Sequence, residues 1–197
     1  MEPILLMLTG LGGAGKSTTA ARLLSILRSS GYDCELIEFD AFRKMIAPPG
    51  VDPFDGDVEA KRFIYGLAAE KLAAKTRSGK SLIVDACVAV ESIRLDLKRK
   101  LPALRLVHID CPMWCAFLRE TLRSLHCCPH ERGHYLYLHA ALDLVNPFCR
   151  KKFSQAGVSY PFEYPLCADA HVSSLRESPT VVAWDIIKTL RIPVPGA

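Results

Sequence analysis

Residues 10–18, GLGGAGKST, place four glycines, a lysine and two hydroxyl side chains directly after the apolar run PILLMLT. Clustered glycines indicate backbone that adopts unusual conformations or lies close to a bulky group. The spacing of Gly10, Gly15, Lys16 and Ser17 is that of a phosphate-binding loop, whose backbone N–H groups converge on a polyphosphate. The nucleotide-binding residues expected from this loop are Gly10, Gly12, Gly13, Ala14, Gly15, Lys16, Ser17 and Thr18.

The chemistry expected of this loop divides between its lysine and its hydroxyl. Lys16 would contact the terminal phosphates, and the Ser17 hydroxyl would ligate Mg²⁺. The helix that follows would add the partial positive charge of its N-terminus. A glycine-rich turn without a ligand is the alternative, but an apolar run, the loop, Lys-Ser and a helical pattern occur here in the order of a phosphate-binding loop. We therefore expect the protein to bind ATP and Mg²⁺.

Two aspartates and an arginine could complete a site around the phosphates. Asp40 ends the run CELIEFD, where it could act as a general base or hold Mg²⁺ through water, or instead cap a helix. Asp85 ends SLIVD and could be an indirect Mg²⁺ ligand or a helix cap. Arg43 could bind an anionic acceptor with its planar fork of donors. Lys16, Asp40 and Arg43 are the predicted catalytic residues, and Ser17 and Asp85 the predicted metal site.

These side chains must be positioned by alternating strands and helices. Short apolar runs predict strands at 4–8, 34–40, 81–86, 104–112 and 168–174. Helical periodicity predicts helices at 17–31, 58–79, 91–101, 113–125 and 178–190, the last with Ser178 as N-cap and Pro179 in its first turn. Alternation of this kind indicates an α/β fold: a P-loop NTPase-type parallel sheet of about five strands, flanked by helices, in a single domain over residues 1–197. Ligands of such sheets bind beyond the carboxyl ends of the strands, where the predicted site residues fall.

Composition limits the function classes. The net charge of +4 in 197 residues is mild, so it suits an anionic small ligand and makes nucleic acid an unlikely partner. No apolar run is long enough to span a membrane, and an apolar N-terminus without a basic leader argues against a signal peptide, so we expect a cytoplasmic protein. The eight cysteines are scattered without a C-x-x-C, and Cys34, Cys87, Cys111 and Cys115 are expected to be small core residues. A homodimer is compatible with the sequence, which does not fix the assembly.

A resemblance to a known family narrows the range of possible functions. GVSYPFEYP, residues 157–165, resembles the signature G-[IV]-x-x-P-[YF]-E-x-P of adenylylsulfate (APS) kinases, and GLGGAGKST is similar to that family's phosphate-binding loop. FDAFRK resembles the family's D-x-D-N-[VL]-R, with Asp40 and Arg43 on the matching aspartate and arginine.

The resemblance implies an ATP-dependent, Mg²⁺-dependent small-molecule kinase that transfers the γ-phosphate of ATP to APS or a similar anionic nucleotide. DVEAKRFIYGLA is similar to D-R-x-E-N-I-R-R-[VI]-A and places Glu59 and Arg62 on that motif. Arg119 matches a lid arginine that contacts ATP. Phe153 could stack on an acceptor base. The expected acceptor-binding residues are Asp40, Arg43, Arg62 and Phe153.

The sequence also departs from the family. Ala60 replaces the motif asparagine, and ACVAVESIR, residues 86–94, replaces F-I-S-P-[YF]-R, so we expect a changed acceptor site. VDACVAVESIR also resembles, without its asparagine, the D-x-T-N pattern of polynucleotide-kinase-like enzymes. Two alternatives therefore stay open: a polynucleotide or nucleoside kinase, and a nucleotide-gated binding module that transfers no phosphate. The guanine tetrapeptide N-K-x-D of GTP-binding switches is absent.

Residues 126–152 are rich in His, Cys, Arg and aromatic side chains and are expected to form a lid over the phosphates. Cys127, His130, His134 and His139 carry donor types that zinc accepts, although their spacing is not that of a standard zinc finger. A structural zinc site is thus the alternative to a mobile lid.

Overall fold

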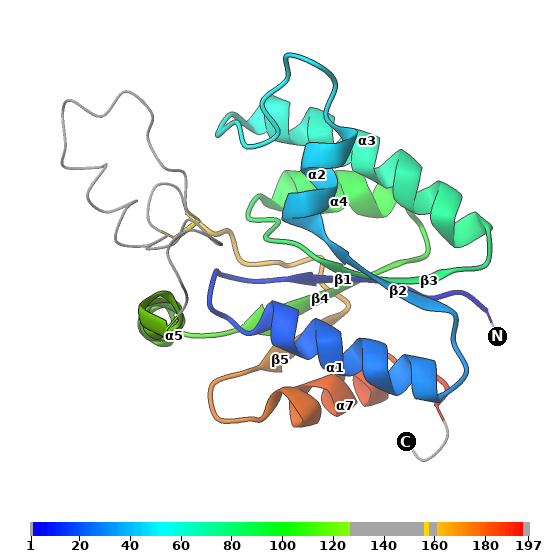
Figure 1. Ribbon diagram of the computed structural model, residues 1–197, viewed down its shortest axis with the longest axis vertical. Coiled ribbons are helices and arrows are strands. Elements are labelled where there is room, and N and C mark those ends of the chain that lie inside the picture. Colours follow the sequence, from blue (N-terminus) through cyan, green and yellow to red (C-terminus); the bar gives the residue numbers. More distant parts are fainter. Residues whose placement is uncertain (1, 127–155, 158–160, 195–197) are drawn as a thin grey trace.

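Five parallel strands form one sheet in the computed structural model, which describes residues 2–126, 156–157 and 161–194. The strand order is β2-β3-β1-β4-β5, which confirms the expected P-loop NTPase-type fold. Leu5 of the central strand is in register with Leu82 of β3 on one side and with Leu104 of β4 on the other. All five carboxyl ends therefore lie at one edge of the sheet (Figure 1).

The described elements follow the predicted order, with one additional helix, Phe39–Ile46, that was not predicted. The strands are β1 (Leu5–Thr9), β2 (Cys34–Glu38), β3 (Ser81–Asp85), β4 (Leu104–Asp110) and β5 (Ala170–Ser173). The helices are α1 (Lys16–Ser29), α2 (Phe39–Ile46), α3 (Val58–Arg77), α4 (Glu91–Lys100), α5 (Met113–His126) and α7 (Pro179–Thr189). Within the described part of the chain, every helix is too short or too polar to span a lipid bilayer.

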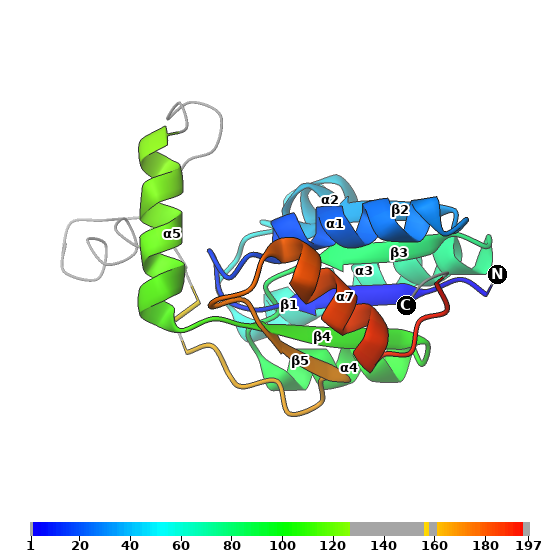
Figure 2. The same ribbon diagram turned by 90° about the horizontal axis from the view of Figure 1, so that it is seen from below.

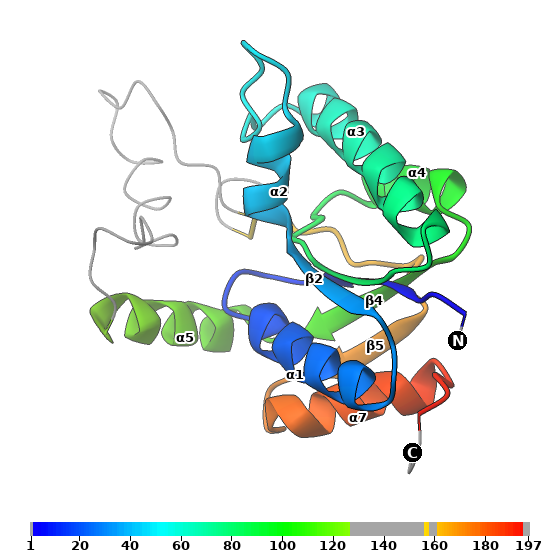
Figure 3. The same cartoon turned by 45° about the vertical axis from the view of Figure 1, so that its right-hand side comes forward.

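Helices cover both faces of the sheet. α1 and α7 lie side by side on one face, and α2, α3 and α4 lie on the other (Figures 1 and 3). β1 is buried on both faces because Leu6 and Leu8 belong to the core under α1 and α7, whereas Leu5 and Met7 belong to the core under α3 and α4. A continuous apolar run is what a strand covered on both sides requires. α5 projects away from these layers at the edge where the strands end (Figure 2).

The helix caps support the predicted boundaries. The Ser178 hydroxyl accepts a hydrogen bond from the backbone N–H of Val181, and Pro179 occupies the first turn of α7, as predicted. At the start of α3, the Asp57 carboxylate accepts hydrogen bonds from the backbone N–H groups of Glu59 (2.8 Å) and Ala60 (3.0 Å). Each cap satisfies N–H groups that the helix itself leaves unpaired.

The predicted end of the second strand is wrong. β2 ends at Glu38, and Asp40 lies in the first turn of α2 instead of at a strand end. Phe39 begins the helix because its ring stacks on Tyr65 of α3, with 4.5 Å between ring centroids. An acidic residue in the first turn also suits the helix dipole.

The edge of the sheet beside β5 carries a buried histidine. His108 of β4 is 4% exposed, and its Nδ1 lies 3.2 Å from Nδ1 of His171 on β5. Phe162 and Tyr164 cover it, with ring centroids at 5.9 and 5.3 Å. Burial lowers the pKa of His108 to about 4; the Asp110 carboxylate acts to raise that pKa, and the charges of His171 and Arg94 act to lower it.

We predict that His108 makes the fold less stable as the pH falls from about 6.5 to 4. In this window the unfolded chain protonates this imidazole and the folded chain does not, so the free energy of unfolding decreases, by up to about 3 kcal/mol at the lower end. Urea unfolding of the wild type and of His108→Gln at pH 7.5 and 5.0 measures this contribution. The wild type should lose about 2 kcal/mol more than the variant between these two pH values. Equal losses would contradict the prediction.

Candidate active site

The loop between β1 and α1 adopts the conformation that its glycines allow. Gly10, Gly13 and Gly15 have φ angles of +153°, +77° and +92°. A Cβ atom on Gly10 would lie 2.5 Å from the carbonyl oxygen of Ile109, and one on Gly13 would lie 2.2 Å from that of Ala116. The loop backbone is therefore wedged against the end of β4 and the start of α5, where only glycine fits.

The lysine of the loop is held by the loop backbone, and the two hydroxyl side chains are exposed at the start of α1. Lys16 is 9% exposed, and its Nζ donates hydrogen bonds to the carbonyl oxygens of Gly10 (3.1 Å) and Leu11 (2.9 Å). This holds the ammonium group within the loop. Ser17 and Thr18 are exposed in the first turn of α1, which Gly15 precedes without offering a side-chain cap. The N-terminus of α1 can thus accept an anion.

Asp40 and Arg43, two of the predicted site residues, form an ion pair. Arg43 Nη2 lies 2.6 Å from Asp40 Oδ1, one turn earlier on α2. The Arg43 guanidinium also stacks on the ring of Phe54, 3.9 Å from the ring centroid. Its Nε is buried and lacks a hydrogen-bond acceptor among the described residues. The ion pair with Asp40 and the stacking on Phe54 therefore hold the guanidinium in place.

Cys87 lies within the electrostatic influence of several predicted site residues. It follows β3 and is partly exposed, unlike Cys34, Cys111 and Cys115, which are buried as expected. Burial raises the pKa of its thiol, and the other groups that act on that pKa are the cations Lys16 and Arg43 and the carboxylates of Asp40 and Asp85. All four are predicted site residues. This environment of Cys87 could not be predicted from the sequence, because the charged groups come from other elements.

A second cation lies near Arg43. Burial lowers the pKa of Lys61 on α3, and the positive charge of Arg43 lowers it further, although Cys87, Asp55 and Asp57 act in the opposite direction. Lys61 therefore adds positive charge beside Arg43. It was not among the predicted site residues; its signal in the sequence is a lysine one turn after the helix cap Asp57.

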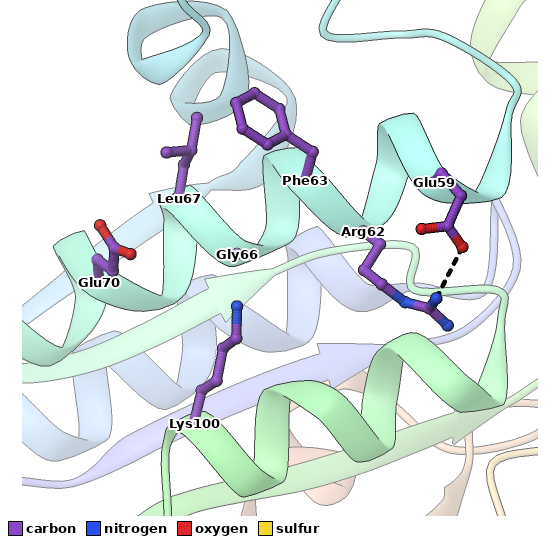
Figure 4. Close-up of a pocket in the computed structure, with 7 residues that line it drawn as sticks. All are labelled: Glu59, Arg62, Phe63, Gly66, Leu67, Glu70 and Lys100. Atoms are coloured by element: carbon purple, nitrogen blue, oxygen red, sulfur yellow. Dashed lines mark hydrogen bonds and ion pairs between the residues drawn. The ribbon is translucent and has the colours of Figure 1, made fainter.

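The side chain of Arg62 lies between α3 and α4, away from the Asp40–Arg43 pair. Its guanidinium pairs with Glu59 (2.7 Å) and Asp96 (3.0 Å) and donates to the Ser92 hydroxyl (3.2 Å). Arg62 and Glu59 line one end of a groove of about 310 Å³ between the two helices, and Lys100 lines the other (Figure 4). The structure does not bring Arg62 into contact with Asp40 or Arg43, so its acceptor-binding role stays a prediction.

Arg119 of α5 lies beside the phosphate-binding loop. Its guanidinium donates to the hydroxyl (3.1 Å) and carbonyl oxygen (2.6 Å) of Ser174, directly after β5. The Ser174 hydroxyl in turn donates to the carbonyl oxygen of Ala14 in the loop (2.7 Å). Arg119 is thus connected to the loop through Ser174, which the sequence analysis did not select.

Of the remaining predicted site residues, Asp85 can be placed in the structure. Asp85 ends β3, in register with Leu8 of β1, next to the strand that leads into the loop. Phe153, the expected lid and the zinc-donor residues lie outside the described residues, except for His126 at the end of α5. Their roles stay predictions.

Fold and loop together define a P-loop nucleotide-binding protein, and comparison with known proteins agrees. A family model described as "AAA domain" matches residues 5–123. The adenylyl-sulfate kinase of Deinococcus deserti is 30% identical over 173 residues, which span 86% of this chain and 81% of that one. The chain therefore belongs to the adenylyl-sulfate kinase-like family of P-loop kinases.

Solved structures share the fold. The structure of the Mycobacterium tuberculosis APS kinase in complex with AMPPNP and APS matches with a TM-score of 0.73 at 18% identity, over 96% of this chain and 98% of that one. A gluconokinase from Sinorhizobium meliloti 1021 matches with a TM-score of 0.60 at 17% identity, over 96% of this chain and 93% of that one. Membership of a P-loop kinase family implies ATP binding.

The glycine contacts predict a loop that cannot accept a methyl group at position 13. Gly13→Ala should weaken binding of an ATP analogue about tenfold or more, because the loop must shift away from Ala116. Gly50→Ala is the matched control: Gly50 has a similar φ of +83° but nothing within 4 Å of an added Cβ. It should cost about 1 kcal/mol of stability from backbone strain and leave binding unchanged. Titration calorimetry with the analogue compares the two, and equal binding losses would contradict the role assigned to the loop.

Proposed function

We propose that this protein is an ATP-dependent small-molecule kinase that transfers the γ-phosphate of ATP to an anionic acceptor, with APS as the first candidate. The observation that carries the proposal is the phosphate-binding loop that holds Lys16, with the ion pair Asp40–Arg43 at the same carboxyl edge of the sheet, directly after β2. A group suited to phosphate and a group suited to an anionic acceptor therefore lie at the same edge of the sheet.

Phosphoryl transfer requires positioning and positive charge more than covalent chemistry. The acceptor oxygen would form a bond to the γ-phosphorus while the bond from that phosphorus to the β–γ bridging oxygen breaks, and the electron pair leaves with ADP. Asp40, with its side chain 79% exposed, would take the hydroxyl proton and pass it to water. Lys16 would stabilise the charge that develops on the phosphoryl oxygens, and Arg43 would hold the acceptor.

The residues present suit Mg²⁺. Ser17 offers an exposed hydroxyl beside the loop, and Asp85 offers a carboxylate near Cys87. Oxygen donors of this kind, with water, are what Mg²⁺ prefers. The bound ion would neutralise phosphate charge, and Ser17 with Asp85 would fix its place.

The acceptor is the least constrained part of the proposal. Support for APS comes from the matched Asp40 and Arg43 and from the related adenylyl-sulfate kinases. Ala60 and residues 86–94 depart from the family's motifs, and Lys61 adds positive charge beside Arg43. These features favour an acceptor with a strong negative charge, which includes APS and other anionic nucleotides. We also propose a cytoplasmic location, in keeping with a kinase that uses ATP.

An ADP-release assay with ATP, Mg²⁺ and a panel of acceptors tests the function. The panel contains APS, phosphoramidate nucleotides, gluconate and oligonucleotide ends. Acceptor-dependent ADP release with one small anion supports the proposal, release with oligonucleotide ends alone supports the polynucleotide-kinase alternative, and slow release unaffected by every acceptor supports a binding module.

Lys16→Ala should lose at least about 100-fold in kcat while the fold survives, because Lys16 acts on charge that grows in the transition state. Circular dichroism and urea unfolding check the fold, and the assay above measures the rate. Turnover of Lys16→Ala at the wild-type rate would show that the loop assignment is wrong.

Arg43→Ala should raise the acceptor KM about tenfold or more and leave the ATP KM nearly unchanged, since the guanidinium would bind the acceptor in ground and transition states alike. Arg43→Lys should rescue this loss in part, because an ammonium group lacks the planar fork. Lys44→Ala is the matched control: it removes a neighbouring cation that also lies over Phe54, at 5.2 Å. Equal effects of Arg43→Ala and Lys44→Ala would contradict a specific acceptor contact.

A further inference from the structure

Arg94 of α4 is a charged side chain with no exposed surface. Its Nε donates to Glu91 Oε2 (2.5 Å), its Nη2 donates to the carbonyl oxygen of Glu163 (2.7 Å), and its Nη1 donates to that of Val88. A buried guanidinium is costly unless its donors are satisfied, and here each nitrogen has an acceptor. Two of these acceptors are backbone carbonyls in segments far apart in sequence.

Glu163 joins the same two segments from the other side. Its backbone N–H donates to the carbonyl oxygen of Ala89 (2.9 Å), and its carboxylate accepts from the backbone N–H of Glu91 (2.5 Å) at the start of α4. Glu91 Oε1 accepts from the backbone N–H of Cys167 (2.9 Å). Burial acts to raise the pKa of Glu91, but the hydrogen bonds from Arg94 and Cys167 outweigh it and hold that pKa below its usual value.

The segment held in this way is the β3–α4 loop, residues 86–90. Its Val88 carbonyl oxygen also accepts from the hydroxyl of Thr9, the last residue of β1 before the phosphate-binding loop (3.2 Å). The carbonyl of Cys87 accepts from the Tyr65 hydroxyl (3.4 Å), and the N–H of Ala86 donates to Leu8 (3.1 Å). With its backbone fixed at these points, the loop connects β1, which leads into the phosphate-binding loop, with Tyr65, which stacks on Phe39 at the start of α2.

We infer that Arg94 and Glu163 are positioning residues: they hold the β3–α4 loop as the wall between the phosphate side and the acceptor side of the site. This inference rests on the proposed kinase function, because the wall matters for turnover only if an acceptor binds there. It also assigns a function to the Pro-Phe-Glu stretch, residues 161–163. Glu163 caps α4 and holds the loop in place, although it is not one of the predicted site residues.

A neighbouring contact provides a control that distinguishes this positioning role from a general effect on the stability of the fold. Lys98, one turn beyond Arg94 on α4, donates to Asp169 (2.8 Å) and to the carbonyl oxygen of Cys167 (2.8 Å). It therefore joins the same helix to the same downstream segment, but its hydrogen bonds go to Cys167 and Asp169 and not to the β3–α4 loop. Lys98→Met is the matched control.

The first measurement needs no acceptor. Alkylation of Cys87 by iodoacetamide is followed by peptide mass spectrometry, with Cys34 as internal reference, because Cys34 is buried in β2 and reports global opening. Relative to Cys34, the Cys87 rate should rise about fivefold in Glu163→Ala and about tenfold or more in Arg94→Lys, since the loop loses hydrogen bonds that close it. Glu163→Gln, which keeps an acceptor oxygen, and Lys98→Met should stay within about twofold of wild type.

The second measurement is kinetic and uses APS as the acceptor probe, or the anionic acceptor found in the panel above. Glu163→Ala should raise the acceptor KM about fivefold with an unchanged ATP KM, and Glu163→Gln should restore it. A change in Cys87 labelling with no acceptor-dependent turnover in the wild type would reject the proposed function and leave the loop brace intact. Equal labelling changes in Glu163→Ala and Lys98→Met, or equal changes of both KM values, would overturn the inference.

Discussion

The site depends on one packing constraint: backbone against backbone at the phosphate-binding loop. Gly10 meets the carbonyl of Ile109, and Gly13 meets that of Ala116, at distances that exclude a Cβ atom. This contact fixes where α1 begins, and hence where Lys16 lies. It also fixes the start of α5, from which Arg119 reaches Ser174, and Ser174 returns to Ala14. Glycines are therefore required in the loop because the ends of β1, β4 and β5 come close together there.

The positive charges of the candidate active site fall into two groups. Lys16 supplies positive charge within the loop, whereas Arg43 and Lys61 supply it on the side of α2 and α3. Asp40 offsets part of the charge of Arg43, so the pair is held together without a ligand. A chain with a net charge of only +4 can in this way concentrate cations where an anion would bind.

Much of this arrangement could be predicted from the sequence, because the loop spacing and the alternation of apolar runs and helical periods are local signals. The end of β2 could not, since Phe39 belongs to a helix only because Tyr65, in a later element, stacks on it. The burial of Arg94 could not be predicted either. ESIRLDLKRK has the composition of a basic, solvated helix, and the hydrogen-bond acceptors of this arginine come from residues 88, 91 and 163. Cys87 gained its neighbours in the same way, through contacts between elements distant in sequence.

The central position of β1 has a consequence for biosynthesis. Its residues precede both partner strands in the chain by a long interval, since these strands lie beyond residue 80. Until those strands emerge, the most buried strand of the protein has no partner and stays available to other chains. Parallel pairing of this kind closes long loops before it yields contacts, so folding is slow and the nascent chain is prone to aggregate. The strand that leads into the phosphate-binding loop thus completes its pairing only after more than half of the 197 residues, those up to and including β4, have been added.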